Sequence, residues 1–338
     1  MSPEEAAAHL AEIAYLLRHK QDAHRARAFT KVAAAILRER PDLAGLRSRN
    51  ALQTIPGVGA GIEKTLLEMI DVGRSSYLER LREETGLEGI PEIGVSPLVE
   101  QGYRGDLHCH TNWSDGGAGV MQMAQAALAR GYEYVAITDH SPRMTIVNGL
   151  TPERLLAQRR QIDEANRSLD GIRVLQGIEV DILEDGSLDL PDETLAALDV
   201  VVASPHLKLR MEKAAMTERM LRAVENPHVD IVGHPTGRRP GSREGADYDF
   251  EQVFRRAAER AVVMEIDCDP ARMDLSPERA RLAHAAGCRL SLDSDAHAPD
   301  QFIYVDLGLW AARQAGVGNE SLVNWLPLEQ LKEVFGSG

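Results

Sequence analysis

Short hydrophobic segments that alternate with helix-length segments are the feature that most constrains the fold of this 338-residue chain. Their β-branched and aliphatic side chains are typical of buried strands. Strands separated by helix-length segments pair in parallel through crossover helices, and about seven such units favour closure into a barrel. We therefore predict an α/β fold, a (β/α)7 barrel. The predicted strands are the segment that runs into His108-Cys109-His110 and residues 134–138, 172–178, 200–203, 230–233, 262–266 and 289–292.

The first strand ends in two histidines, His108 and His110, followed by Asp115 in a glycine-containing turn. Side chains two residues apart in an extended segment share a face, so both imidazoles can reach one metal ion, while Cys109 points the other way into packing. The turn can bring the Asp115 carboxylate to a second ion. Taken alone, a His-x-His pair is more often a pair of hydrogen-bonded core histidines than a metal site.

The same residue types recur where the other predicted strands end, with the exception of residues 262–266. The further candidates are His140, Glu179, His206, His234, Asp295 and His297. In a parallel barrel these positions converge on one face. Any single one of them is explained as a helix cap, but a buried group of imidazoles and carboxylates is costly unless cations compensate it. Nitrogen and oxygen donors without thiolate favour Zn, Mn or Fe.

The N-terminal region is helical in pattern. Residues 4–40 predict two amphipathic helices broken near Gln21-Asp22, and residues 52–64 predict two helical patterns joined by a tight turn. This turn contains Gly57, Gly59 and Gly61, with Lys64 behind them. Glycines at a helix start expose backbone N–H groups that can cradle a phosphate oxygen. The segment resembles a helix-hairpin-helix motif, which holds the DNA backbone without reading bases. The alternative is a glycine-capped hairpin without a ligand.

Glycine and proline interrupt every pattern in residues 86–103, which we predict to be a linker. The predicted domains are therefore residues 1–85, all-α, and residues 104–338. The net charge of −14 argues against a protein that wraps long DNA. No hydrophobic run is long enough to span a bilayer, and three cysteines without Cys-x-x-Cys spacing fit a reducing compartment. We expect a cytoplasmic protein without a membrane partner.

Residues 104–300 resemble a PHP (polymerase and histidinol phosphatase) domain. The signature is matched in order by His108-Cys109-His110, Asp115, Thr138-Asp139-His140, Glu179, His206, His234 and Asp295-Ala296-His297. Segments 225–238 and 264–275 are similar to the PHP portion of bacterial family X DNA polymerases, and residues 1–85 resemble their N-terminal helix-hairpin-helix domain. The resemblance implies a distorted (β/α)7 barrel preceded by a small all-α domain.

The resemblance also implies a trinuclear metal cluster, with Zn or Mn as the expected ions and Fe or Mg as alternatives. It assigns His108, His110, Glu179 and Asp295 to the first ion, Glu179, His206 and His234 to the second, and Asp115, His140 and His297 to the third. Such a cluster suits phosphoester hydrolysis. Lys208 and Arg238 follow two of the histidines. We consider them as substrate phosphate contacts, with ordinary surface charge as the alternative.

Two departures from the polymerases are informative. The polymerase fingers and palm have no counterpart, so nucleotide polymerisation is excluded on this interpretation. Thr65 occupies the place of the Schiff-base lysine of lyase-competent members, with Lys64 beside it, which argues against a deoxyribose-phosphate lyase.

Three functions remain open from the sequence. The leading hypothesis is a metal-dependent phosphoesterase on DNA ends in DNA repair, as a 3′–5′ exonuclease, a 3′-phosphatase or an abasic-site processing enzyme. The first alternative is a small-molecule phosphatase of the histidinol-phosphate or nucleoside-phosphate type, which the low aromatic content of 4% favours because base-stacking platforms are scarce. The second is a non-catalytic DNA-binding repair scaffold. The expected partners are DNA and a phosphoester substrate, and we expect a monomer.

Overall fold

A computed structural model of the chain describes residues 1–85 and 98–336. These residues form two compact units, one of residues 1–85 with 239–244 and the other of residues 98–238 with 245–336. Among the described residues, none of the helices combines the length and the apolar character needed to cross a lipid bilayer.

The first unit is helical. Its elements are α1 (Pro3–His19), α2 (Ala23–Glu39), α3 (Leu43–Ser48), the 3-10 turn η1 (Leu52–Thr54), α4 (Ala60–Val72) and α5 (Ser76–Thr85). The expected break between the first two helices is confirmed, because Gln21 has a positive φ of 61° and the Asp22 side chain caps α2 by accepting from the Arg25 N–H.

The glycine turn differs in part from the expectation. The first of the two expected helical segments is only the 3-10 turn η1. Pro56 explains this, because a proline disfavours helical backbone at the residue that precedes it, here Ile55. Gly57 has a φ of 91°, and Gly59 is the N-cap of α4 without a side-chain cap. The turn therefore presents an open helix N-terminus, and its phosphate-binding role stays a prediction.

Residues 98–103 are not a linker. Leu98–Gln101 form the 3-10 turn η2, and the buried Tyr103 donates its O–H to the Leu292 carbonyl at 3.0 Å. These residues belong to the second unit, and the side chains of Leu98 and Tyr103 are buried. The rest of the predicted linker, residues 86–97, lies outside the described residues.

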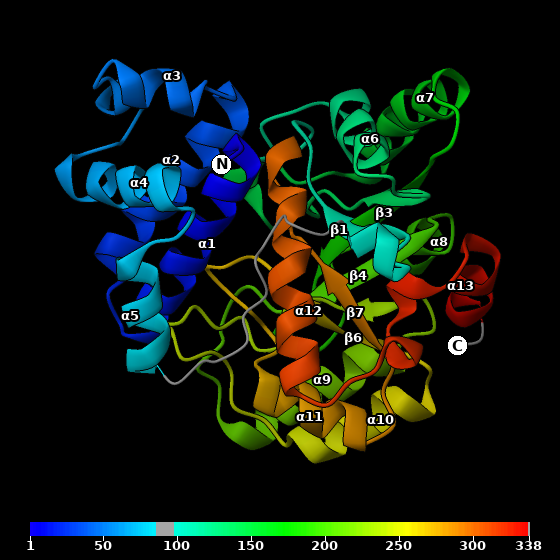
Figure 1. The fold of residues 1–338 in the computed structure, drawn as a ribbon. Coiled ribbons are helices and arrows are strands. Elements are labelled where there is room, and N and C mark those ends of the chain that lie inside the picture. Colours follow the sequence, from blue (N-terminus) through cyan, green and yellow to red (C-terminus); the bar gives the residue numbers. More distant parts are fainter. Residues whose placement is uncertain (86–97, 337–338) are drawn as a thin grey trace. The chain divides into compact units, whose positions relative to one another are not determined.

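The second unit is a seven-stranded parallel sheet in sequential order, with helices around it (Figure 1). The strands are β1 (Gly105–Cys109), β2 (Tyr134–Ile137), β3 (Arg173–Asp181), β4 (Val200–Ser204), β5 (Ile231–Val232), β6 (Val263–Asp267) and β7 (Leu290–Asp293). The helices are α6 (Val120–Ala129), α7 (Pro152–Ser168), α8 (Asp192–Leu195), α9 (Lys213–Glu225), α10 (Phe250–Glu259), α11 (Pro277–Ala285), α12 (Val305–Gln314) and α13 (Leu328–Phe335). Short 3-10 turns occupy Thr145–Val147, Pro299–Tyr304, Asn319–Ser321 and Val323–Trp325. The predicted (β/α)7 architecture is confirmed.

Side chains take part in closing the barrel between β1 and β7. Asp293 accepts from the Leu107 N–H at 2.8 Å, and Asp106 accepts from the Ser294 N–H at 3.1 Å. Beyond these contacts, Cys109 forms a single parallel bridge with Ala296. Carboxylates thus replace part of the ladder that joins the other neighbouring strands, and the barrel closes irregularly between β1 and β7.

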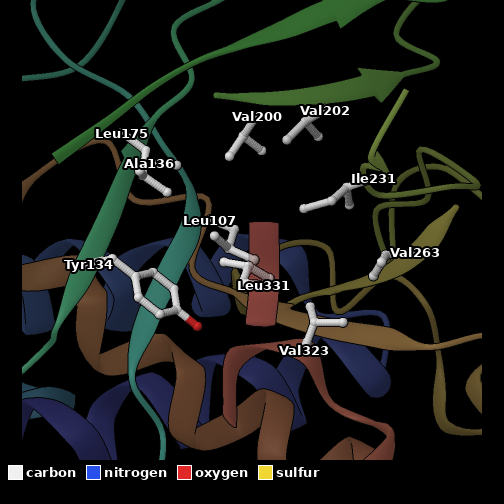
Figure 2. Packing of buried hydrophobic residues seen from close by; sticks show 10 residues of the cluster. All are labelled: Leu107, Tyr134, Ala136, Leu175, Val200, Val202, Ile231, Val263, Val323 and Leu331. Carbon is white, nitrogen blue, oxygen red and sulfur yellow. The ribbon is translucent and has the colours of Figure 1, made fainter. Parts of the chain in front are cut away.

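The hydrophobic core fills the end of the barrel where the strands begin. Figure 2 shows ten of its side chains, which come from the strands and from the C-terminal segment. Val200, Ile231 and Val263 are each the first residue of their strand, and Leu331 of α13 packs against the same cluster with no exposed surface. This leaves the opposite end, where the strands terminate, for polar residues.

We expect Leu331→Ala to lower the free energy of unfolding by about 2–5 kcal/mol, because it opens a cavity in this cluster. Leu156→Ala is the matched control, since Leu156 is 73% exposed and its replacement is expected to change stability by less than about 0.5 kcal/mol. Urea unfolding followed by tryptophan fluorescence measures the barrel, since Trp113, Trp310 and Trp325 all lie in the second unit. Equal stability of the two variants would contradict the assigned core.

Candidate metal centre

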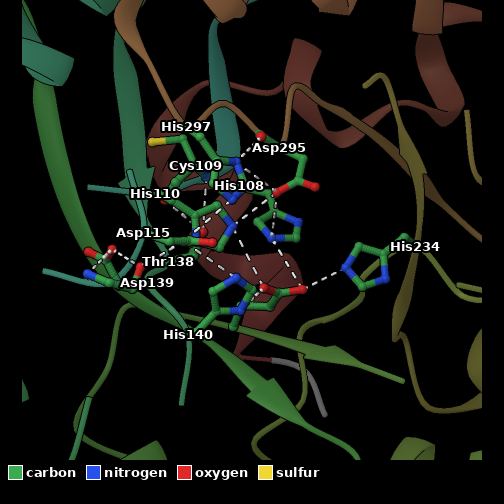
Figure 3. Close-up of polar contacts among 12 residues, drawn as sticks. His108, Cys109, His110, Asp115, Thr138, Asp139, His140, His234, Asp295 and His297 are labelled. Atoms are coloured by element: carbon green, nitrogen blue, oxygen red, sulfur yellow. Dashed lines mark hydrogen bonds and ion pairs between the residues drawn. The ribbon is translucent and has the colours of Figure 1, made fainter. Parts of the chain in front are cut away.

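The two histidines of the first strand share one buried space, as their spacing predicts. His108 Nε2 lies 3.6 Å from Glu179 Oε1 and 3.7 Å from Asp295 Oδ1. His110 Nε2 lies 3.0 Å from Asp295 Oδ1 and 3.6 Å from Glu179 Oε2. Cys109 points away, and its thiol contacts the Ala136 carbonyl at 3.2 Å (Figure 3). β1, β3 and the turn after β7 thus supply one ligand group.

Glu179 is the centre of a second group. Its Oε1 lies 3.1 Å from His206 Nε2 and 2.6 Å from His234 Nε2, and its Oε2 lies 2.6 Å from His140 Nδ1. The side chain is fully buried, and the imidazoles come from the segments that follow β2, β4 and β5. Figure 3 shows His140 and His234 directed toward the same space as His108 and His110.

A third group lies nearer to solvent. Asp115 Oδ1 is 3.6 Å from His140 Nε2, 3.4 Å from His297 Nε2 and 4.0 Å from His110 Nδ1. The side chains of Asp115 and His297 are 30% and 31% exposed, whereas His110 is completely buried. This group is therefore the one that solvent reaches most readily.

The donor atoms fit divalent ions. In three groups of residues, each residue offers one ligand atom that lies within 4.8 Å of the ligand atoms of the others. The groups are His110, Asp115, His140 and His297; His108, His110 and Asp295; and His140, Glu179 and His206. Two atoms that bind one ion at 2.0–2.1 Å in a tetrahedron lie about 3.3 Å apart, close to most of the separations given above. Several buried ring nitrogens, among them His108 Nε2 and His110 Nδ1, have no hydrogen-bond partner among the described residues, so the cluster offers free ligand atoms.

Burial and the neighbouring charged groups shift the pKa values of the histidines in different directions. Burial and the neighbouring charges of His297 and His140 lower the pKa of His110 to about 3, so it is a neutral ligand at pH 7. Burial alone would lower the pKa of His140, but Glu179 and Asp115 outweigh it and raise that pKa to about 10. Burial is likewise outweighed at His297, where Asp115 and Asp295 raise the pKa to about 9.

Two carboxylates that the sequence reasoning missed orient the histidines. Glu265 Oε1 lies 2.7 Å from His108 Nδ1, and Asp181 Oδ1 lies 3.1 Å from His206 Nδ1. Such partners fix the ring so that the other nitrogen faces the ion. The sixth strand, which ends in none of the expected ligand types, thus contributes an orienting acid from within the strand. An acid inside the apolar segment 262–266 is the signal, because a buried carboxylate needs a partner.

Asp139 and Arg272 hold the loops around the centre. Asp139 accepts from the Thr111 N–H at 2.8 Å and from the Ser114 N–H at 3.1 Å, which fixes the turn that carries Asp115. The buried Arg272 places Nε 3.1 Å from Asp295 Oδ2, on the side of that carboxylate away from its Oδ1 contacts.

The remaining predicted residues lie outside this cluster. Lys208 is exposed in a left-handed turn with a φ of 55°. Arg238 is half-buried, and its Nε donates to the Arg272 carbonyl at 3.1 Å. Gly57, Gly59, Gly61 and Lys64 belong to the first unit and line a hollow there. Their roles stay predictions.

We expect metal binding to release protons and to tighten as the pH rises from about 6 to about 9. His140 and His297 hold their protons at pH 7, and an ion must displace them. Each displaced proton raises the affinity by about tenfold per pH unit below the pKa of its group. Calorimetry of Mn²⁺ or Zn²⁺ binding in two buffers of different ionisation enthalpy measures this release. An affinity that does not change over this range would contradict the assignment.

Comparison with known proteins identifies the family. The PHP domain model matches residues 106–267. The DNA polymerase/3′-5′ exonuclease PolX of Bacillus subtilis is 39% identical over 236 residues, which cover 70% of this chain but only 41% of that protein. A probable phosphatase of Photobacterium profundum is 35% identical over 207 residues, which cover 57% of this chain and 77% of that protein.

A solved structure, the histidinol phosphate phosphatase of Lactococcus lactis in complex with zinc, L-histidinol and phosphate, is 17% identical with a TM-score of 0.46 and covers 64% of this chain and 95% of that one. The family model lies within the barrel unit, and the Photobacterium relative is matched at 35% identity over 77% of its own length. The chain therefore belongs to the PHP (polymerase and histidinol phosphatase) domain family of metal-dependent phosphoesterases.

Proposed function

We propose that this chain hydrolyses phosphoester bonds at DNA ends, as a 3′–5′ exonuclease, a 3′-phosphatase or an abasic-site processing enzyme in DNA repair. The observation that carries the hydrolytic part is the convergence of three ligand groups around Glu179 and Asp295. The DNA part is supported by the 39% identity to PolX and by the open helix N-terminus in the first unit.

We propose three ions, held as the resemblance implies. His108, His110, Glu179 and Asp295 hold the first ion, Glu179, His206 and His234 the second, and Asp115, His140 and His297 the third. The distances above support the first and third sets directly. The second set is supported by the contacts of His206 and His234 with one oxygen of Glu179. Zn or Mn suits these nitrogen and oxygen donors best, with Fe or Mg as alternatives.

Bound ions supply an acidic water and offset charge on the phosphoryl and leaving oxygens. The protein residues do the remaining work. Glu265 and Asp181 hold the His108 and His206 rings in one orientation, and the buried walls around Glu179 exclude bulk water. Arg238 has its Nε bound to the Arg272 carbonyl, which leaves the terminal guanidinium nitrogens for a substrate phosphate.

The first unit is proposed to hold the DNA backbone. A hollow of about 510 Å³ is lined by the glycine turn and by three cations, Arg25, Lys64 and Arg80. Added Cβ atoms at Gly59 and Gly61 would meet nothing within 4 Å, so the backbone N–H groups at the start of α4 lie open. Open N–H groups at a helix N-terminus together with cations are the chemistry that phosphate contacts need.

A small-molecule phosphatase is the second candidate. The Photobacterium relative is called a probable phosphatase, and the match to it covers only 57% of this chain, less than the share of the barrel unit. If the chain is a small-molecule phosphatase, the first unit takes no part in catalysis. DNA and a small phosphate ester therefore need to be compared as substrates.

We expect the double variant His108→Ala, His110→Ala to lose hydrolysis of end-labelled DNA in Mn²⁺ or Zn²⁺ by more than about 100-fold. Replacing a residue that only hydrogen-bonds to a metal ligand typically lowers metal affinity or activity about 10–100-fold, and this variant removes two ligands themselves. His284→Ala, on the outer helix α11, is the matched control and is expected to keep full activity. If the wild-type protein neither shortens DNA nor releases phosphate from it with any of these ions, the DNA-end proposal is wrong.

We expect Lys64→Glu to weaken DNA binding for all sequences alike and to reduce the dependence of log affinity on log salt by about one unit. Hydrolysis of p-nitrophenyl phosphate is expected to stay unchanged, because that substrate needs only the metal centre. Arg38→Glu is the control, since Arg38 is 65% exposed on α2 and does not line the hollow. Unchanged DNA affinity in Lys64→Glu would favour the small-molecule phosphatase.

A further inference from the structure

Arg219 is an unusual residue of α9 because its long cationic side chain is almost completely buried. Only 1% of its surface is exposed, and α9 lies on the outside of the strands (Figure 1). Burial is the largest influence on its guanidinium and lowers its pKa, whereas Glu184 and Asp181 raise it only through their charges. A buried cation without a directly bound acid is costly, so its position needs a reason.

The guanidinium binds two backbone carbonyls that belong to different loops. One terminal nitrogen donates to the Leu207 carbonyl at 2.9 Å, and the other donates to the Ile182 carbonyl. Its Nε has no hydrogen-bond partner among the described residues. Arg219 is therefore used to join these two loops.

Each bound carbonyl comes directly after a residue of the metal centre. Ile182 follows Asp181, and Leu207 follows His206. Asp181 Oδ1 and His206 Nδ1 lie 3.1 Å apart, and His206 Nε2 faces Glu179. Arg219 thus joins the backbone of the orienting acid to the backbone of the ligand that it orients.

The strands cannot provide this connection. The ladder between β3 and β4 ends at the pair Asp181 and Ser204, and the Ile182 N–H donates to the Ser204 carbonyl at 3.0 Å. Beyond that point the segments that follow β3 and β4 continue as separate loops. Gly186 keeps the first loop against α9, since an added Cβ there would lie 2.7 Å from the Arg219 carbonyl.

We propose that Arg219 is a positioning residue for the ion held by His206. By fixing both carbonyls, it sets the distance between Asp181 and His206 and so the direction of His206 Nε2. This inference rests on the proposed function only in taking His206 as a metal ligand. The terminal nitrogens of Arg219 bind backbone carbonyls and none of the proposed ligand atoms, so the role we assign to it is positioning.

The test compares ion binding by Arg219→Met, Arg219→Lys and the control Arg222→Met, with His206→Ala as the reference for loss of this ligand. Arg222 is exposed one turn along the same helix, and its Cβ lies beside Gly186 of the first loop. Its replacement by methionine keeps that Cβ and leaves both carbonyl contacts of Arg219 in place, so it removes only the charge. Calorimetry with Mn²⁺ and the visible spectrum of bound Co²⁺ report each ion without requiring activity. Arg219→Met is expected to weaken one ion about 10–100-fold, and Arg219→Lys, which can reach one carbonyl, to weaken it less.

The outcomes separate this inference from the proposed function. If wild-type protein binds no ion, or His206→Ala loses none, the metal assignment itself is wrong. If His206→Ala loses one ion and folded Arg219→Met binds all ions as the wild type does, the positioning role is wrong. Should Arg219→Met fail to fold, Arg219→Lys decides: weaker binding of one ion with an unchanged urea midpoint of the metal-free protein supports the role, and weakening of all ions or of none overturns it.

Discussion

The Glu179 carboxylate is the group on which the organisation of the barrel depends. Imidazole nitrogens of His140 and His234 approach it to 2.6 Å, and those of His206 and His108 lie at 3.1 and 3.6 Å from it. Burial opposes its charge, but the surrounding histidines keep its pKa well below the usual value. A buried carboxylate can persist in this form only among positive charges, which protons or metal ions supply. The strands and their loops are arranged so that these partners meet.

The barrel separates stability from chemistry along its axis. Apolar side chains gather where the strands begin, closed by Leu331 of α13, while ligands and their partners gather where the strands end. Polar residues also enter the seam between β1 and β7, where burial and the nearby charge of Asp293 raise the pKa of Asp106. The seam therefore joins the barrel through groups next to the metal centre. Orienting residues such as Glu265 and Arg219 belong to the same polar end.

Much of the barrel and of the metal centre could be predicted from the sequence. Six of the expected strands differ from the structure by no more than about three residues at either end, and the nine candidate ligands meet in one place. Strands are visible because each is a short apolar run between turn signals. The role of Glu265 was missed because its partner, His108, lies 157 positions away in the chain. Residues 98–103 were misjudged because Tyr103 is buried through contacts with Tyr132 and Trp325, far away in the chain, which no local pattern reveals.

The sequence by itself determined the alternation of strands and helices, the parallel barrel and the ligand types at the strand ends, since these follow from local periodicity and chemistry. Only the tertiary structure decided which donor atoms lie within reach of one another, which carboxylate orients which ring, and that Arg219 joins two loops of the centre. These features depend on distances between residues far apart in the chain. Such distances are set by how the strands close into the barrel, which leaves no local trace in the sequence.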